Sequence, residues 1–178
     1  MSISLRADRT RRVCFDALLT AAAMILSYLE SVIPLQMLIP LPGVRLGLAN
    51  LAVVAVFVLV SPLDAAIVSS VRIFAMGLLF GSVTSLYFSA LGGLCSFLML
   101  LLLRYVGKKL SFVGVSLLCA AAHNTGQILA AITLFDKGLL FSYLPTLLLA
   151  SVLCGGAVGI LLNLITPRLQ RILKGGRT

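Results

Sequence analysis

The stretch LYFSALGGLCSFLMLLLL, residues 86–103, contains no charged side chain. A helix needs about 20 mostly apolar residues, each rising about 1.5 Å, to cross about 30 Å of hydrocarbon. The stretch is therefore predicted to form a transmembrane helix.

The rest of the chain has the same character. Of its 178 residues, 61% are hydrophobic and 11% are charged, whereas a soluble domain is usually about 45–50% apolar and about 25% charged. Too few polar side chains remain to cover a globular surface. We therefore expect an all-α integral membrane protein, whose length leaves no room for a soluble catalytic module.

Six segments are predicted to span the membrane, and they lie at residues 13–33, 45–60, 64–80, 86–103, 112–134 and 140–165. The second is short for a span. Pro62 and Asp64 favour a tight turn and a helix start before the third. The predicted organisation is one membrane domain at 13–166, with basic flanks at 1–12 and 167–178.

Lys and Arg residues indicate the orientation of the bundle. They gather in the N-terminal flank, in the loop after residue 103 and in the C-terminal tail, and the net charge is +9. With six spans these regions fall on one side, which the positive-inside rule makes cytosolic. This explains the basic charge better than nucleic-acid binding does, and predicts a multi-pass protein of a bacterial inner or plasma membrane with both termini in the cytosol.

Arg72 lies in the middle of the third predicted helix. An arginine there costs about 2.5–3.5 kcal/mol on insertion scales. It should therefore face the bundle interior, either in an ion pair, with Glu30 as the candidate partner, or toward a ligand. The two interpretations are compatible, because an anionic ligand can take over a paired arginine.

The segment AAHNTGQ, residues 121–127, places three polar side chains in an apolar helix. His123, Asn124 and Gln127 fall within an arc of about 100°. Thr125 points elsewhere and can bond back to its own helix. The arc indicates either interhelical hydrogen bonds or a polar cavity. A single histidine without a second ligand at suitable spacing makes a metal site improbable.

Arg45 and Asn50 flank the start of the second predicted helix. They are about 140° apart on a helix, so both can face one point only if the helix start is distorted. Arg45 has a simpler explanation as an interfacial anchor, whereas Asn50 lies deeper. We predict that both belong to the same binding site as Glu30, Arg72, His123, Asn124 and Gln127.

Small residues recur at a spacing of four. Ala17 and Ala21 lie in the first predicted helix, and Gly155 and Gly159 lie in the last. Such pairs allow helices to approach closely, either inside the protein or against a partner.

Motifs for catalysis are absent from the sequence. There is no GxxxxGK[ST] phosphate-binding loop and no aspartate-rich cluster to hold Mg²⁺ on a diphosphate. We therefore predict a protein without catalytic residues, cofactor or metal.

Four segments together resemble a known family. They are PLPGVRLGLANLAVV at 40–54, LYFSALGGLCSFLMLLLL at 86–103, AAHNTGQ at 121–127 and YLPTLLLASVLCGGAVGILLN at 143–163. This pattern resembles the Gx transporter family, also labelled heptaprenyl diphosphate synthase component I. That family looks like a branch of the substrate-binding S components of energy-coupling factor (ECF) transporters.

The resemblance implies six transmembrane helices and a pocket that captures a small polar or anionic molecule from outside. It also implies partners, namely a transmembrane coupling subunit and two ATPase subunits. Ala17 and Ala21 resemble the docking surface for the coupling subunit. The other label implies a non-catalytic accessory role in prenyl diphosphate synthesis, and a stand-alone facilitator is a third possibility.

Overall fold

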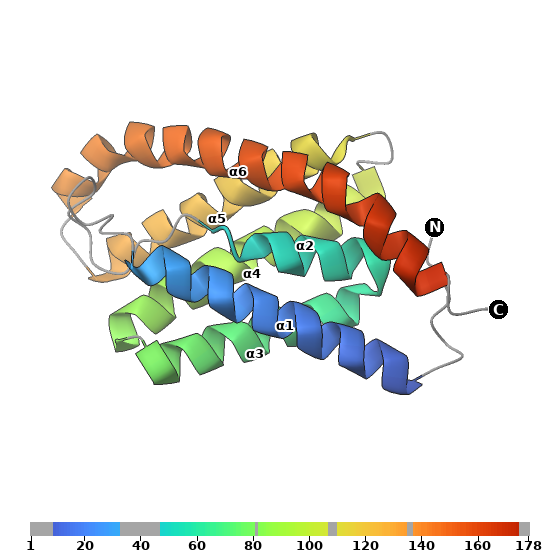
Figure 1. Ribbon diagram of the computed structural model, residues 1–178. Helices are drawn as coiled ribbons and strands as arrows, with labels where there is room; N and C mark the ends of the chain where they lie inside the picture. The colour runs from blue at the N-terminus through green and yellow to red at the C-terminus, as the bar shows by residue number, and fades with distance from the viewer. Residues whose placement is uncertain (1–8, 33–46, 81, 107–109, 135–136, 175–178) are drawn as a thin grey trace.

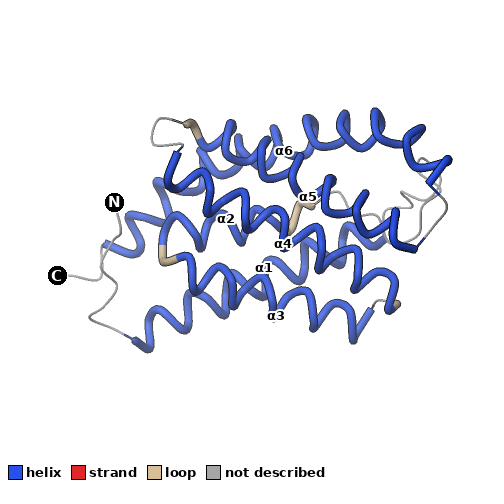
Figure 2. The backbone as a smooth tube through the Cα atoms, turned by 180° about the vertical axis from the view of Figure 1, so that it is seen from behind, coloured by secondary structure: helices blue, strands red, loops and turns tan. Residues whose placement is uncertain are grey.

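The computed structural model describes residues 9–32, 47–80, 82–106, 110–134 and 137–174. Helices form almost all of this part of the chain, and it contains no strand (Figure 2). Six helices follow one another: α1 (Arg9–Val32), α2 (Asn50–Leu59), α3 (Pro62–Phe80), α4 (Val83–Val106), α5 (Phe112–Leu134) and α6 (Lys137–Lys174). The predicted all-α fold is confirmed.

Helix boundaries differ from the prediction mainly at α2 and α6. The predicted second helix began at Arg45, but α2 begins at Asn50, after a turn in which Gly47 has a φ of +86°. This left-handed conformation suits glycine and interrupts the helix. In contrast, α6 passes through Pro145 and Pro167 and continues into the predicted basic tail.

The helices form two layers (Figure 1). α1, α2 and α6 lie in front and α4 and α5 behind them, while α3 packs beside α1 and α4. α1 begins and α6 ends at the same end of the bundle, which we call the terminal end. α2 contacts all five other helices. It has 10 residues, so it spans only about 15 Å, which is half of the hydrocarbon thickness.

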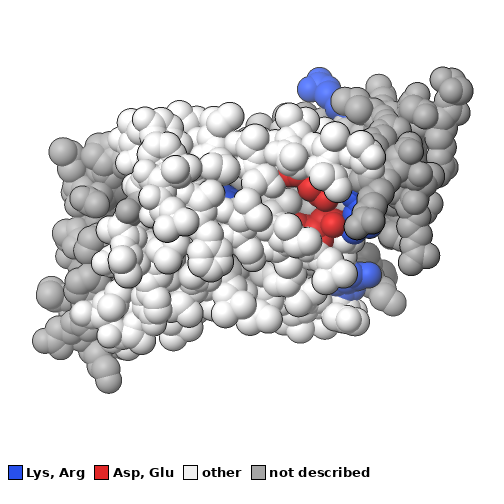
Figure 3. Space-filling view, turned by 90° about the horizontal axis from the view of Figure 1, so that it is seen from below, with Lys and Arg blue, Asp and Glu red and all other residues white. Residues whose placement is uncertain are grey.

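Five helices are long and apolar enough to cross a membrane, and α2 is a shorter apolar helix between them. Large apolar side chains point outward, among them Leu78 and Val83, which are 83% and 85% exposed. On the face shown in Figure 3, most acidic and basic side chains gather toward one end, and the remainder is uncharged apart from a small basic spot nearer the middle. Such a surface suits lipid, so the chain is a multi-pass membrane protein.

The main apolar core surrounds α2. Seven of its ten residues are buried, and Val56 and Leu59 pack with Leu100 of α4 and Leu162 of α6. A helix that is apolar on all sides belongs in the interior. The α2 helix therefore forms the centre of the bundle on its terminal side.

Close contact between α5 and α6 depends on the two predicted small residues. A Cβ atom at Gly155 would lie 2.9 Å from that of Ala120, and one at Gly159 would lie 2.5 Å from Cα of Val113. The prediction that these glycines permit close helix packing is confirmed, with the contact lying inside the bundle.

An ionic contact joins α1 to the start of α3 at the terminal end. Arg12 donates to Asp64, with Nε 3.0 Å from Oδ2. Ser61 precedes the helix, and its Oγ accepts from the Asp64 backbone N–H and donates to Asp64 Oδ2. With Pro62 in the first turn, this is the helix start that the sequence predicted.

Candidate functional site

Buried polar side chains gather near the middle of the bundle, around the N-terminal end of α2. Each is less than 9% exposed, although large apolar groups face the outside. We call this group the polar cluster, and its members are Ser27, Glu30, Asn50, Ser69, Arg72, Ser96, His123 and Gln127.

α1 contributes two members that meet different neighbours. The Glu30 carboxylate accepts a hydrogen bond from the backbone N–H of Leu48, in the turn before α2. One turn earlier, Ser27 Oγ lies 3.5 Å from Nη1 of Arg72 on α3. A carboxylate at a helix N-terminus is favourable because the helix dipole is positive there. Ser27 and Glu30 lie three residues apart and share one face of α1. The Arg72 guanidinium and the Glu30 carboxylate therefore both lie at this face.

His123 fits between two glycines. A Cβ at Gly92 of α4 would lie 2.7 Å from Cε1 of the imidazole, and one at Gly47 would lie 3.4 Å from Cδ2. Nε2 of His123 is 3.1 Å from Nε2 of Gln127. The imidazole therefore depends on the small residues of α4 and on the turn before α2 for its position.

Asn50 stands at the first residue of α2 and connects to α4. Its Nδ2 donates to Ser96 Oγ over 3.4 Å, and it lies beside Gly47, which adjoins His123. The interrupted helix start brings Asn50 to the same place as His123 and Gln127. The predicted convergence of Arg45 and Asn50 on one point stays a prediction, because Arg45 lies outside the described residues.

Asn124 faces a different helix from His123. Its Nδ2 donates to the Leu147 carbonyl at 2.7 Å and to Ser151 Oγ at 2.9 Å, both on α6. This is an interhelical contact. Thr125 is exposed and donates to the Ala121 carbonyl at 2.9 Å, so its predicted bond to its own helix is confirmed.

The remaining predicted residues lie elsewhere. Arg45 is outside the described residues. Ala17 and Ala21 are exposed on α1, which packs against α2 and α3. Their predicted role in docking a partner stays a prediction.

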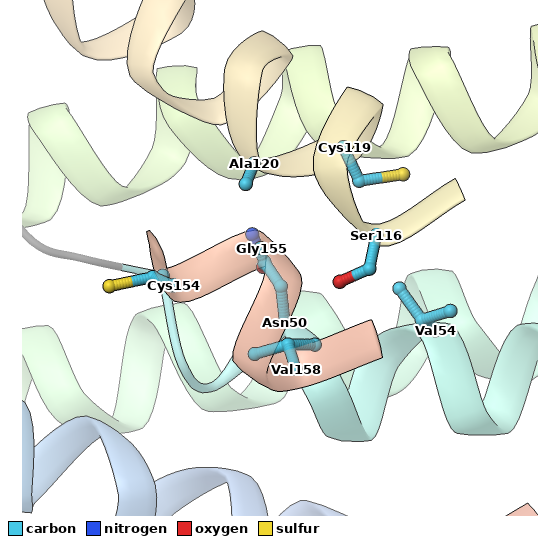
Figure 4. Close-up of a pocket in the computed structure, with 9 residues that line it drawn as sticks. Asn50, Val54, Ser116, Cys119, Ala120, Cys154, Gly155 and Val158 are labelled. Carbon is cyan, nitrogen blue, oxygen red and sulfur yellow. The ribbon is translucent and has the colours of Figure 1, made fainter. Parts of the chain in front are cut away.

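A small pocket adjoins the polar cluster between α2, α5 and α6 (Figure 4). Its cavity volume, measured as the space open to the centre of a water-sized sphere, is about 10 Å³, which is room for about one water molecule. Gly47 and Asn50 line it beside the cluster. The rest of the lining consists of Val54, Ser116, Cys119, Ala120, Cys154, Gly155 and Val158.

Sequence reasoning missed the buried serines. Ser27, Ser69, Ser96 and Ser116 are each at most 7% exposed. A signal was available, because Ser27 precedes Glu30 by three residues and Ser69 precedes Arg72 by three. Residues three apart share a helix face, so each serine should accompany its charged neighbour into the interior.

The arrangement suits binding by hydrogen bonds and charge. It combines one guanidinium, one carboxylate, one imidazole and two amides, all withdrawn from water and lipid. Within the described ranges, no three His, Cys, Asp or Glu side chains lie close enough together to hold a metal ion.

Comparison with known proteins identifies the family. Residues 19–165 match the family model described as heptaprenyl diphosphate synthase component I. The chain belongs to this family. No curated protein and no solved structure matches it.

In this heptaprenyl diphosphate synthase component I chain, the matched region contains α2 to α5 completely and most of α1 and α6. All members of the polar cluster and the pocket fall inside it. Arg12 lies before it. The family description names a component of a synthase. The long apolar helices make this chain a membrane component.

Proposed function

We propose that this protein is the substrate-binding membrane subunit of an ECF-type importer, capturing a small polar or anionic molecule at the polar cluster. The observation that carries the proposal is the burial of Arg72, which is 4% exposed in the middle of a membrane helix. A charge at this depth costs several kcal/mol, on the order of 3 on insertion scales, and usually marks a substrate or ion pathway.

Packing alone explains the cluster poorly. Replacing buried ionic groups by apolar residues of similar size is often neutral or stabilising. The cluster nevertheless holds three ionisable groups. Arg72 contacts Ser27, one turn from Glu30. Glu30 accepts from Leu48, next to the Gly47 that adjoins His123. Groups that cost stability are retained where they serve binding or another function.

Transport by such a subunit requires partners that hydrolyse ATP. The exposed face of α1 with Ala17 and Ala21 is the proposed docking surface for a transmembrane coupling subunit. Small side chains would let a partner helix approach closely. The coupling subunit would in turn bind two ATPase subunits.

Affinity purification tests this proposal. The tagged protein should recover the coupling and ATPase subunits from its native membrane. Ala17→Leu should reduce their recovery at least tenfold, while Ala90→Leu, at an exposed position of α4, should leave it unchanged. Uptake of substrate against a gradient by the purified chain alone would refute the proposal.

The family name favours a second candidate function. As a component of heptaprenyl diphosphate synthesis, the protein would assist a soluble synthase without performing the chemistry. Reconstitution with such a synthase decides between the two. More long-chain prenyl product only when this protein is present would favour the accessory role.

A further inference from the structure

The hydrogen bond between His123 and Gln127 determines which nitrogen of the imidazole carries a proton. Nε2 of His123 lies 3.1 Å from Nε2 of Gln127. An amide nitrogen can only donate, so the imidazole Nε2 must accept, and it can accept only when it carries no hydrogen. The proton of the neutral imidazole then lies on Nδ1. The two residues are 2% and 1% exposed, so water does not compete for this bond.

Gly92 of α4 holds the imidazole in place for this bond. A Cβ atom at Gly92 would lie 2.8 Å from Nδ1 and 3.1 Å from Nε2 of His123, as well as close to Cε1. The opposite edge of the ring adjoins Gly47, where a Cβ atom would lie 3.4 Å from Cδ2 and 3.8 Å from Cγ. A rigid ring therefore fills the space between two residues that have no side chain.

The backbones of α4 and α5 touch within one turn of His123. A Cβ atom at Gly126 would lie 2.5 Å from the carbonyl oxygen of Leu91 and 2.8 Å from Cα of Gly92. Small residues at a helix crossing allow such close approach. The crossing fixes the distance from α5 to Gly92, and it therefore fixes the position of the imidazole as well.

We infer that His123 is held as the neutral Nδ1–H tautomer, with Gln127 as the donor to Nε2 and Gly92 as the positioning residue that keeps the ring within reach of Gln127. His123 then presents a hydrogen-bond donor and no charge at Nδ1. The inference rests on the proposed function for its meaning in transport. A ligand group that meets Nδ1 has to be an acceptor, such as a carboxylate or carbonyl oxygen.

Nitrogen NMR tests the inference, because His123 is the only histidine in the chain. The whole protein, with isotope-labelled histidine and a purification tag that contains no histidine, is measured in lipid nanodiscs at pH 8, where histidine is ordinarily uncharged. The chemical shifts of the two ring nitrogens show which one carries the proton. The Nδ1–H form should exceed the Nε2–H form about tenfold or more. A majority of the Nε2–H form, or a charged imidazole, would overturn the inference.

Replacing Gln127 tests its role as the donor. Gln127→Met removes the amide but keeps an unbranched side chain, so the ratio of Nδ1–H to Nε2–H should fall about fivefold or more. Thr125→Val is the control, because Thr125 is exposed on the same helix and donates to the Ala121 carbonyl. This control should leave the ratio unchanged. An unchanged ratio in Gln127→Met would show that another group sets the tautomer, and the inference would be wrong.

Gly92→Ala tests the positioning role. The new methyl group would meet the imidazole and push it away from Gln127, so the same ratio should fall about threefold or more. Gly93→Ala is the control at the next residue of α4, where a Cβ atom would lie 2.7 Å from Cδ1 of Ile73, the end of a flexible side chain. The control should keep the original ratio, and equal ratios in the two variants would remove the positioning role.

A second variant applies if Gly92→Ala does not fold. Combining it with His123→Ala removes the ring that the new methyl group would meet, so the double variant should regain the helical circular dichroism of the original protein. Failure of the double variant to fold would place the clash elsewhere and would also remove the positioning role.

These results are separable from the proposed function. The Nε2–H tautomer with ATPase subunits still recovered would remove this inference and leave the importer. The Nδ1–H tautomer without recovered ATPase subunits would retain the inference about His123 and remove the importer.

Discussion

The two ends of α2 lie in contrasting surroundings. Leu59, at its C-terminal end, is 1% exposed and belongs to the apolar core. Asn50, at its N-terminal end, is almost as deeply buried but lies among His123, Ser96 and the Gly47 turn. One end is built as a packed interior. The other holds polar groups whose burial costs free energy, which indicates that stability is not their main purpose.

The largest loss of stability is expected from a substitution where the helices leave no space for a side chain. Gly159→Val would force a side chain against the Val113 backbone, 2.5 Å from the new Cβ. We expect a loss of about 3 kcal/mol or more in unfolding free energy, because overpacking displaces backbone as well as side chains. Unfolding in mixed micelles of rising SDS content, followed by circular dichroism, measures this loss.

Gly156 provides a matched control three residues away. Nothing lies within 4 Å of a Cβ atom placed there. Gly156→Val therefore makes the same chemical change on the same helix without a clash. Equal destabilisation of the two variants would show that α5 and α6 do not depend on close packing at Gly159.

Smaller losses of stability are expected at α2, and they should differ between its two ends. Leu59→Ala should cost about 2–4 kcal/mol of stability, because it leaves a cavity in the core. Asn50→Ala should cost about 1 kcal/mol, since it removes one hydrogen bond. The same SDS titration compares them.

Ligand retention should show the opposite order. Native mass spectrometry of the purified protein should find a co-purifying small molecule with Leu59→Ala and lose it with Asn50→Ala. A ligand lost equally from both variants would mean that the polar end of α2 has no special part in binding.

Long apolar segments could be predicted well from the sequence because membrane thickness fixes their length. The predicted spans 64–80 and 112–134 nearly match α3 and α5. The start of α2 was missed because a left-handed Gly47 lies within a mostly apolar segment. Hydropathy does not register backbone conformation.

The site could be predicted residue by residue but not as an arrangement. Arg72, His123 and Gln127 are buried, as is expected of polar groups in apolar membrane helices. Asn124 points toward Ser151 because of the way in which α5 and α6 cross. The angular positions of residues on one helix contain no information about that crossing. Ser116 is unremarkable in the sequence, since serine is common in membrane helices.

The smallest effect should come from the contact that joins α1 to α3 beyond the apolar core. The side chain of Arg12 is 34% exposed and that of Asp64 is 10% exposed. Pairs with this much access to water contribute about 0.5–1 kcal/mol and weaken in salt. Arg12→Ala should therefore lower the melting temperature by only a few degrees, and less in 1 M than in 0.05 M salt.

Arg104 is the control, because it is an exposed basic residue in the last turn of α4. Arg104→Ala should not alter the melting temperature at either salt concentration. If Arg12→Ala instead destabilised the protein as much as Leu59→Ala, the ionic contact would be part of the core rather than an accessory to it. The Arg12–Asp64 pair would then be a polar contact that stabilises the fold as much as the apolar end of α2 does. Such a contribution requires the pair to be shielded from water more completely than its exposed fraction indicates.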